Sequence, residues 1–270
     1  RSAAKNHAHV AVLVDPADYG TVSDELTSTA TVSSETRKRL ARKAFAHTGA
    51  YDAAIFTYLQ KESGDNSFPE RLPIGLKLQS QLRYGENPHQ AAALYSIGSG
   101  GPGTLVSATQ LQGKPLSFNN IADGNAALEC VKSLDSCGCV IVKHANPCGV
   151  ALADDPELAY RKAYACDPTS AFGGIIAFNT PVNGATAAAI IANQFVEVVV
   201  APSFDDSALK AFAAKANLRV LACGTWDKQA AAGRVLQQVE GGMLVQDKDV
   251  ASVTRAELKV VSKRQPTERE

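Results

Sequence analysis

The sequence predicts an α/β protein with a mixed or mostly parallel β-sheet. Beyond Arg83, short β-branched runs alternate with segments in which small and apolar residues recur every three or four positions. This alternation is typical of strands joined by helices that cover a sheet. The chain has 270 residues, of which 45% are hydrophobic, and this is enough for one large domain or two modest ones.

The first part of the chain predicts one strand and one long helix. The apolar run Val10–Val14 indicates a strand that stops at Asp15 and Pro16. From Glu35 to Glu62, apolar side chains recur at helical spacing, and Ser33 and Ser34 stand where an N-cap is expected. Several basic residues near the start of this helix are expected on a solvated face: Arg37, Lys38, Arg39, Arg42 and Lys43.

A change of composition marks a boundary after this helix. Residues 63–73 combine Gly64, Pro69 and Pro73 with Asp, Asn and Ser, which is typical of a connection rather than of a helix or strand. We therefore divide the chain into a first domain at residues 1–68, a linker at 69–80 and a second domain at 81–270.

The second domain contains the alternating elements. Its strand candidates are residues 139–142, 174–178, 196–201 and 218–222, and its helix candidates are residues 122–134, 156–165, 185–193 and 207–216. In parallel α/β sheets, ligands bind outside the carboxyl ends of the strands. The first candidates for a site are therefore the pairs that follow three of these strands: Lys143-His144, Pro202-Ser203 and Cys223-Gly224.

Composition excludes several classes of protein. The 27 Lys and Arg residues balance 27 Asp and Glu residues, and there is no like-charge block of the kind that binds nucleic acid. No apolar run approaches the roughly 18 residues of a membrane span, so we expect a cytoplasmic protein without a membrane partner. The six cysteines match no disulfide framework, and we expect free thiols. Since the chain starts at Arg1, we expect it to be part of a longer protein.

The sharpest local feature is the end of the predicted strand at residues 139–142. Lys143 and His144 follow this strand directly, and the chain then breaks at Asn146-Pro147-Cys148-Gly149. A histidine can accept or donate a proton near neutral pH, and a neighbouring lysine can stabilise a developing negative charge. The alternative is a histidine bonded to a backbone carbonyl and a lysine that points into water.

Cys148 allows two other interpretations. As a nucleophile it would use His144 as its base, which would make the protein a thiol hydrolase. As a metal ligand it would belong to a zinc deaminase, but the sequence lacks the glutamate and the second thiolate of that signature. We therefore reject this zinc site and predict no metal.

Three further segments could contact a ligand. Arg83 and Tyr84 lie in Leu-Arg-Tyr-Gly-Glu-Asn-Pro-His-Gln at 82–90, and such a pair suits a planar anion, because guanidinium binds phosphate or carboxylate and a ring can stack; an ordinary surface turn is the alternative. Asn120 lies in Ser-Phe-Asn-Asn-Ile-Ala-Asp at 117–123, where helix capping is the alternative to ligand contact. Gly173 ends a loop before a strand, where backbone amides could approach a ligand.

Together, four motifs resemble one family: those at 82–90 and 117–123, Val-Lys-His-Ala-Asn-Pro-Cys-Gly at 142–149 and Pro-Thr-Ser-Ala-Phe-Gly-Gly at 168–174. The chain is similar over its whole length to the bifunctional purine biosynthesis family of the bacterial type, which joins an IMP cyclohydrolase domain to an AICAR transformylase domain. The resemblance implies that residues 1–68 are the end of a small α/β cyclohydrolase domain. It also implies that residues 81–270 begin a transformylase domain with a cytidine-deaminase-like fold.

The resemblance implies de novo purine biosynthesis. The transformylase moves a formyl group from the cosubstrate 10-formyltetrahydrofolate to the 5-amino group of AICAR. By match to the family motifs, His144 accepts the proton of the amino group, and Lys143 stabilises the transition state. The substrate-binding residues implied are Arg83, Tyr84, Asn120, Gly173 and Glu197, the last of which stands where some relatives have Asp.

The resemblance also implies the second activity, closure of formyl-AICAR to IMP, with Lys5 as the proton-transfer residue. Its motif is Arg-Ser-Ala-Ala-Lys-Asn-His at 1–7. Other parts of both sites are expected outside this sequence, at its N-terminal and C-terminal sides. The family also implies a homodimer with sites at the interface and no metal requirement. A non-catalytic nucleotide-binding fragment and the Cys148–His144 thiol hydrolase remain alternative hypotheses.

Overall fold

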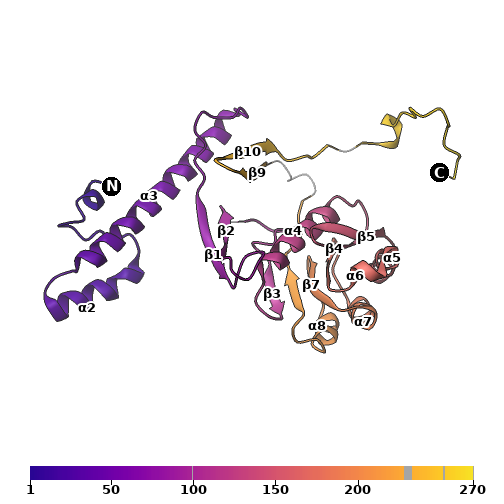
Figure 1. Cartoon of the computed structure of the whole chain (residues 1–270), viewed down its shortest axis with the longest axis horizontal. Coiled ribbons are helices and arrows are strands. Elements are labelled where there is room, and N and C mark those ends of the chain that lie inside the picture. Colours follow the sequence, from indigo (N-terminus) through magenta and orange to yellow (C-terminus); the bar gives the residue numbers. More distant parts are fainter. Residues whose placement is uncertain (99, 228–232, 252, 270) are drawn as a thin grey trace.

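The computed structural model describes residues 1–98, 100–227, 233–251 and 253–269. It shows an N-terminal group of helices, a small two-stranded sheet and a six-stranded sheet covered by helices. In Figure 1 the long helix α3 extends away from the six-stranded sheet, and the strands β1 and β2 lie between them.

The N-terminal helices are α1 (Ser2–Lys5), the short 3-10 helix η1 (Pro16–Asp18), α2 (Tyr19–Thr29) and α3 (Ser34–Ser63). The long helix that the sequence predicts is thus confirmed. Its N-cap is Ser33, whose hydroxyl accepts the Thr36 amide at 3.1 Å. It ends at Gly64, which has a φ of +68° and supplies the left-handed residue with which helices commonly end.

The predicted strand at Val10–Val14 is wrong. This segment has no strand partner among the residues that the structure describes. Its valines Val12 and Val14 instead pack against a small cluster of alanines from α1 and α3. An apolar run of this length can be buried by helices as well as by a sheet, so hydrophobicity alone did not decide its conformation.

The predicted solvated face at the start of α3 is only partly correct. Lys38 and Arg42 are exposed, but Arg39 and Lys43 each lie 2.7 Å from the Asp18 carboxylate. Hydrogen bonds from Lys43 and Arg39 hold the pKa of Asp18 below its usual value. These ion pairs connect η1 to α3.

Two antiparallel strands follow α3 and precede the large sheet in the sequence. The strands β1 (Leu76–Leu82) and β2 (Ala92–Ile97) form this pair, so β1 begins within the stretch predicted as the linker. Near the other end of the chain, β9 (Arg234–Val239) and β10 (Gly242–Asp247) form a second hairpin. Arg234 donates to the carbonyls of Asn66 and Ser67 at 3.1 and 2.9 Å, so this hairpin lies beside the loop after α3 (Figure 1).

The large sheet has the strand order β3-β8-β7-β6-β4-β5. Its strands are β3 (Thr109–Gln112), β4 (Gly138–Lys143), β5 (Asn146–Leu152), β6 (Gly174–Phe178), β7 (Val196–Ala201) and β8 (Arg219–Ala222). Strands β6, β7 and β8 are parallel, whereas β3, β4 and β5 pair antiparallel with their neighbours. The mixed α/β class and the four predicted strands are therefore confirmed, and β3 and β5 are additions.

Helices cover both faces of this sheet (Figure 1). One face packs against α4 (Phe118–Lys132), with Leu128 and Val131 on Val140 and Val142 of β4. The other face packs against α5 (Pro156–Cys166), α6 (Pro168–Ala171), α7 (Gly184–Asn193) and α8 (Asp206–Phe212). Successive strand residues point to opposite faces, and helices bury both faces, so β4, β6 and β7 are apolar at nearly every position. The four helices predicted in this domain are confirmed, and α8 ends four residues before the predicted limit at 216.

The expectation that three strand ends share one edge of the sheet is wrong. Because β4 runs antiparallel to β6, Lys143 at the end of β4 lies beside the beginning of β6. Pro202-Ser203 and Cys223-Gly224 follow the parallel strands β7 and β8 and lie at the opposite edge. The sequence pattern identified the strands but not their directions.

A close approach between β5 and α5 provides a test of this packing. A Cβ atom at Gly149 would lie 2.0 Å from the carbonyl oxygen of Ala163, so the backbone must move in Gly149→Ala. We expect the free energy of unfolding in urea to fall by about 3 kcal/mol. The matched control is Gly49→Ala in α3, where nothing lies within 4 Å and helix propensity favours alanine by about 1 kcal/mol. Equal unfolding midpoints for the two variants would contradict the described packing.

Candidate functional site

The candidate site is centred on the hairpin that joins β4 to β5. Lys143 pairs with Asn146, so the hairpin loop consists of His144 and Ala145 alone. Their φ angles are 52° and 59°, the positive values that a type I′ hairpin turn requires at both central positions. Each non-glycine residue in this conformation costs about 1–2 kcal/mol. The turn therefore needs compensating contacts.

The predicted break at Asn146-Pro147-Cys148-Gly149 is wrong, because these residues begin β5. The register shifts there, so that Ile141 pairs with Gly149 and Val142 with Pro147, and Cys148 is the extra residue of a bulge. An edge strand with a bulge can include a proline, which lacks the N–H group of a regular ladder. The turn is thus two residues earlier than the sequence indicated.

Two side chains hold the turn. The Ala145 amide donates to Oδ1 of Asp123 at 2.8 Å, and Nδ2 of Asn146 donates to the His144 carbonyl at 2.8 Å. Asp123 belongs to α4, so the helix that covers the sheet also contacts the hairpin. The sequence prediction did not single out Asp123, although it is the last residue of the motif at 117–123.

Lys143 lies against the loop that leads into β6. Its Nζ donates to the Phe172 carbonyl at 2.5 Å. Gly173 has a φ of +72°, a conformation that favours glycine, and a Cβ atom there would lie 3.3 Å from this Nζ, so the loop and the lysine head are in close contact. The Gly173 amide donates to the Phe195 carbonyl at 2.8 Å, which joins this loop to the start of β7.

An aromatic pair adjoins the lysine. The rings of Phe172 and Phe195 lie 5.6 Å apart between centroids, and the two residues are 62% and 54% exposed. Large exposed rings beside a charged group form a surface on which a flat heterocycle can stack. The sequence analysis named neither ring as a ligand contact, although Phe172 lies in the motif at 168–174, because only the fold brings these two loops together.

Asn120 and Glu197 also lie at this edge of the sheet, where α4 meets the start of β7. Nδ2 of Asn120 donates to Oε2 of Glu197 at 2.9 Å, and Nη1 of Arg219 lies 3.7 Å from the same oxygen. The capping alternative for Asn120 is also correct, since Ser117 and Asn120 form a reciprocal capping box at the start of α4. The structure thus brings together five predicted residues at one edge of the sheet: Lys143, His144, Asn120, Gly173 and Glu197.

The other predicted residues lie elsewhere. Arg83 and Tyr84 follow β1, and the Arg83 Cζ lies 5.2 Å above the Tyr84 ring centroid. No described hydrogen bond or ion pair connects either of them to the hairpin of His144. Lys5 is the last residue of α1, which packs against α3 far from the large sheet (Figure 1). The structure therefore does not join Lys5 to the candidate site.

The geometry of Cys148 does not favour a nucleophile. Its Sγ donates to the Ile141 carbonyl at 3.5 Å, and the side chain packs against the cluster that contains α5. Burial raises the pKa of this thiol, which lowers the fraction of reactive thiolate. No described contact joins Cys148 to His144. Among the described residues, no three His, Cys, Asp or Glu side chains are grouped as a metal site would require.

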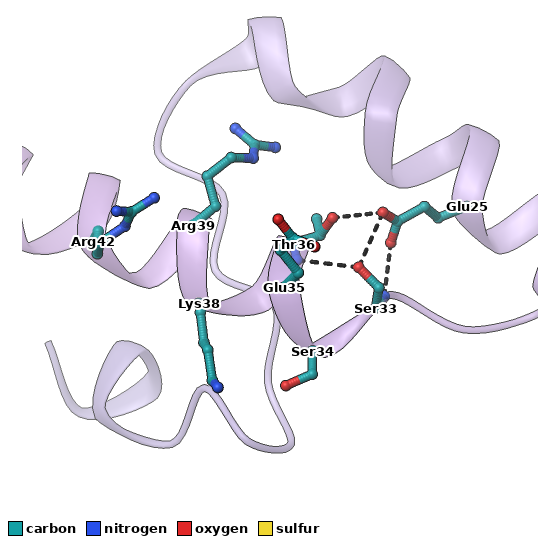
Figure 2. Close-up of a pocket in the computed structure, with 8 residues that line it drawn as sticks. All are labelled: Glu25, Ser33, Ser34, Glu35, Thr36, Lys38, Arg39 and Arg42. Atoms are coloured by element: carbon teal, nitrogen blue, oxygen red, sulfur yellow. Dashed lines mark hydrogen bonds between the residues drawn. The ribbon is translucent and has the colours of Figure 1, made fainter.

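Two hollows lie away from this edge. One, of about 300 Å³, lies at the opposite edge of the sheet and includes Pro202, Cys137, Thr180 and Trp226 in its lining. The other, of about 750 Å³, lies at the start of α3. Figure 2 shows that the Glu25 carboxylate occupies this helix start and accepts hydrogen bonds from Ser33 and Thr36. None of the predicted catalytic residues lines either hollow.

The fold and the edge define an α/β protein with adjacent lysine and histidine side chains at a strand end, beside exposed aromatic rings. A family model described as AICARFT/IMPCHase bienzyme matches residues 3–270. The chain therefore belongs to the AICARFT/IMPCHase bienzyme family. This family implies de novo purine biosynthesis, with formyl transfer to AICAR, IMP cyclohydrolase activity or both. No helix in the described parts of the chain is both long and apolar enough to cross a membrane.

The contact between Asn120 and Glu197 can be tested by stability. Asn120 is only 4% exposed, so Glu197→Ala leaves its amide donor without this acceptor. We expect a loss of about 1–3 kcal/mol in the free energy of unfolding in urea. Glu197→Gln keeps an oxygen acceptor and should lose less. If the alanine variant were as stable as the unmodified chain, this hydrogen bond would not hold α4 to β7.

Proposed function

We propose that this chain carries the formyl-transfer dyad of an AICAR transformylase, with His144 as the general base and Lys143 as the electrostatic stabiliser. The observation that supports this most strongly is the location of both residues on one hairpin, next to Gly173, Asn120 and Glu197. Residues from three separate sequence motifs, those at 117–123, 142–149 and 168–174, contribute to this edge.

In the proposed reaction, the 5-amino nitrogen of AICAR attacks the formyl carbon of 10-formyltetrahydrofolate. A new C–N bond forms, and the bond from the formyl carbon to N10 of the folate breaks. The amino group loses one proton, and N10 gains one when tetrahydrofolate leaves. His144 accepts the first proton and returns it to the leaving nitrogen, so the histidine is unchanged after each turnover.

Lys143 stabilises the negative charge that develops on the formyl oxygen. Its ammonium group already lies near the loop of Gly173, where it donates to the Phe172 carbonyl. This hydrogen bond favours one direction for a long and flexible side chain, so less ordering is needed when substrate binds. The exposed rings of Phe172 and Phe195 offer a stacking surface to the pterin of the folate.

We propose nucleotide contacts for Arg83, Tyr84, Asn120, Gly173 and Glu197, as the family motifs imply. The Arg83 guanidinium has donors in the fork geometry that matches phosphate. Asn120 and Glu197 already pair with each other, so a bound ribose or amide would use their remaining hydrogen-bonding groups. Formylation of AICAR would then use 10-formyltetrahydrofolate as cosubstrate, and we propose no metal requirement.

For the second activity of the family, we propose that Lys5 transfers a proton during closure of formyl-AICAR to IMP. Its support is the match of residues 1–7 to the family motif, which belongs to the first domain at 1–68. The transformylase domain is then 81–270, with 69–80 as the linker. The separation of α1 from the large sheet in Figure 1 agrees with two sites rather than one.

We also propose a cytoplasmic homodimer without nucleic-acid or membrane partners. Apolar side chains are exposed along α3 and on the sheet of β1 and β2, including Tyr51, Ile55, Leu76 and Ile97. Exposed large apolar side chains that recur on neighbouring elements are typical of a protein interface. A second copy of the chain would cover it.

Replacement of His144 tests the function. We expect His144→Ala to lower kcat for formyl transfer by about 10²–10⁴-fold, since a positioned base contributes that much. Release of tetrahydrofolate from 10-formyltetrahydrofolate in the presence of AICAR is the measurement. The matched control is Cys148→Ala, four residues away, which should retain activity.

Three outcomes would contradict this proposal. Loss of activity in Cys148→Ala with activity kept in His144→Ala would support a thiol mechanism instead. AICAR binding without turnover in the unmodified chain would indicate a nucleotide-binding fragment. If the unmodified chain showed no binding of AICAR and no turnover, the assignment of the site to this edge would be wrong.

A further inference from the structure

We propose that Asp123 is a positioning residue that holds the His144–Ala145 turn in the conformation from which His144 acts. The inference rests on the proposed function, because it assigns a purpose to the orientation of the same histidine. It adds a residue of α4 that neither the motif analysis nor the family description assigns to the site.

The turn is built from residues that disfavour its conformation. Both central residues have positive φ angles, at 52° and 59°, and such turns usually contain Asn-Gly, Asp-Gly or Gly-Gly. Alanine has no side-chain polar group that could stabilise the left-handed conformation locally. An external contact is therefore needed to keep this backbone in place.

Asp123 supplies that contact. Its Oδ1 accepts the Ala145 amide at 2.8 Å across 22 residues of sequence. The strand pairing ends at Lys143 and Asn146, so the Ala145 amide has no place in the regular ladder. The Asn146 side chain makes a second hydrogen bond to the turn, in which its Nδ2 donates to the His144 carbonyl. Both hydrogen bonds thus hold the same peptide group, the one that joins His144 to Ala145, and this backbone sets the direction in which the Cα–Cβ bond of His144 leaves the turn.

The helix that carries Asp123 is itself fixed near this point. Ser117 and Asn120 close its first turn as a capping box, and Asn120 binds Glu197 on β7 at 2.9 Å. Asp123 follows Asn120 by three residues, so both lie on the same face of the helix. Four residues further, Ala127 is fully buried against the sheet. The carboxylate therefore approaches the turn from a rigid support.

Two substitutions of Asp123 separate its possible contributions. Asp123→Ala removes the acceptor, and we expect kcat for formyl transfer to fall by about 10–100-fold, as small misplacements of a reacting group do. KM for AICAR should change by less than about threefold, because the nucleotide contacts remain. Asp123→Asn keeps an oxygen acceptor and should retain most of kcat.

The matched control is Asp155→Ala. Asp155 also accepts one backbone amide, that of Leu158 at 2.9 Å, and it follows β5 at the end of the strand opposite to Asn146. Its loss should affect stability but not kcat at temperatures well below unfolding. An equal fall of kcat in Asp155→Ala would show that any destabilised variant loses activity, and this result would overturn the proposal.

A third variant tests the conformational cause. Glycine adopts positive φ without the steric cost of alanine, so Ala145→Gly should raise kcat when it is added to Asp123→Ala. In the unmodified background the same change should not raise kcat. An absence of rescue, together with a large rise in KM, would indicate that Asp123 contacts substrate and does not act through the turn.

Amide hydrogen exchange separates failure of this inference from failure of the proposed function. In the unmodified protein the Ala145 amide should be protected, and Asp123→Ala should abolish that protection while Asp123→Asn preserves most of it. This readout does not depend on turnover. If the protein did not transfer formyl groups but the protection behaved as described, only the proposed function would be wrong. Unchanged protection in Asp123→Ala would overturn the role of Asp123.

Discussion

The antiparallel pairing of β4 with β6 determines where the candidate site lies. In a fully parallel sheet, Lys143 would lie at the same edge as Pro202 and Cys223. Because β4 runs the other way, its last residue instead meets the loops that lead into β6 and β7. Gly173, Phe172, Phe195 and Glu197 all belong to those loops or strand starts, so one reversal of direction brings them to Lys143.

The same reversal allows the tight connection to β5. Antiparallel neighbours can be joined by two residues, and His144 is one of these two. His144 is exposed in this turn, and the tight turn restricts its φ and ψ angles. Such a restriction suits a group that must approach a substrate from a fixed direction. Positive φ angles at non-glycine residues are often found at functional sites, where the surrounding structure compensates for their cost.

The sequence predicted the elements better than their arrangement. Helices α3, α5 and α7 follow from local spacing of apolar residues and from caps, and their limits differ by only a residue or so from those observed. Strand β5 was missed because Asn-Pro-Cys-Gly reads as a turn, although an edge strand with a bulge accommodates it. Val10–Val14 was misassigned because burial by helices and burial by a sheet leave the same apolar pattern.

The site was predictable only in part, because local sequence patterns identify single residues but not the contacts between distant ones. Lys143, His144 and Gly173 were identified from their motifs, and each lies at the end of a predicted strand or just before one. The contact of Asp123 with Ala145 spans 22 residues, and that of Asn120 with Glu197 spans 77. No local pattern encodes such contacts. A weak signal did exist for Asp123, since it follows Asn120 at helical spacing in the same motif.

The most direct test of this account is a titration of the isotope-labelled chain with AICAR, followed by amide chemical shifts. We expect the largest changes at Ala145, Gly173 and Glu197, at the edge where β4 ends and β6 and β7 begin. Cys137 and Thr180, at the opposite edge, should not change. Shifts confined to the opposite edge would contradict the location of the site that the direction of β4 defines.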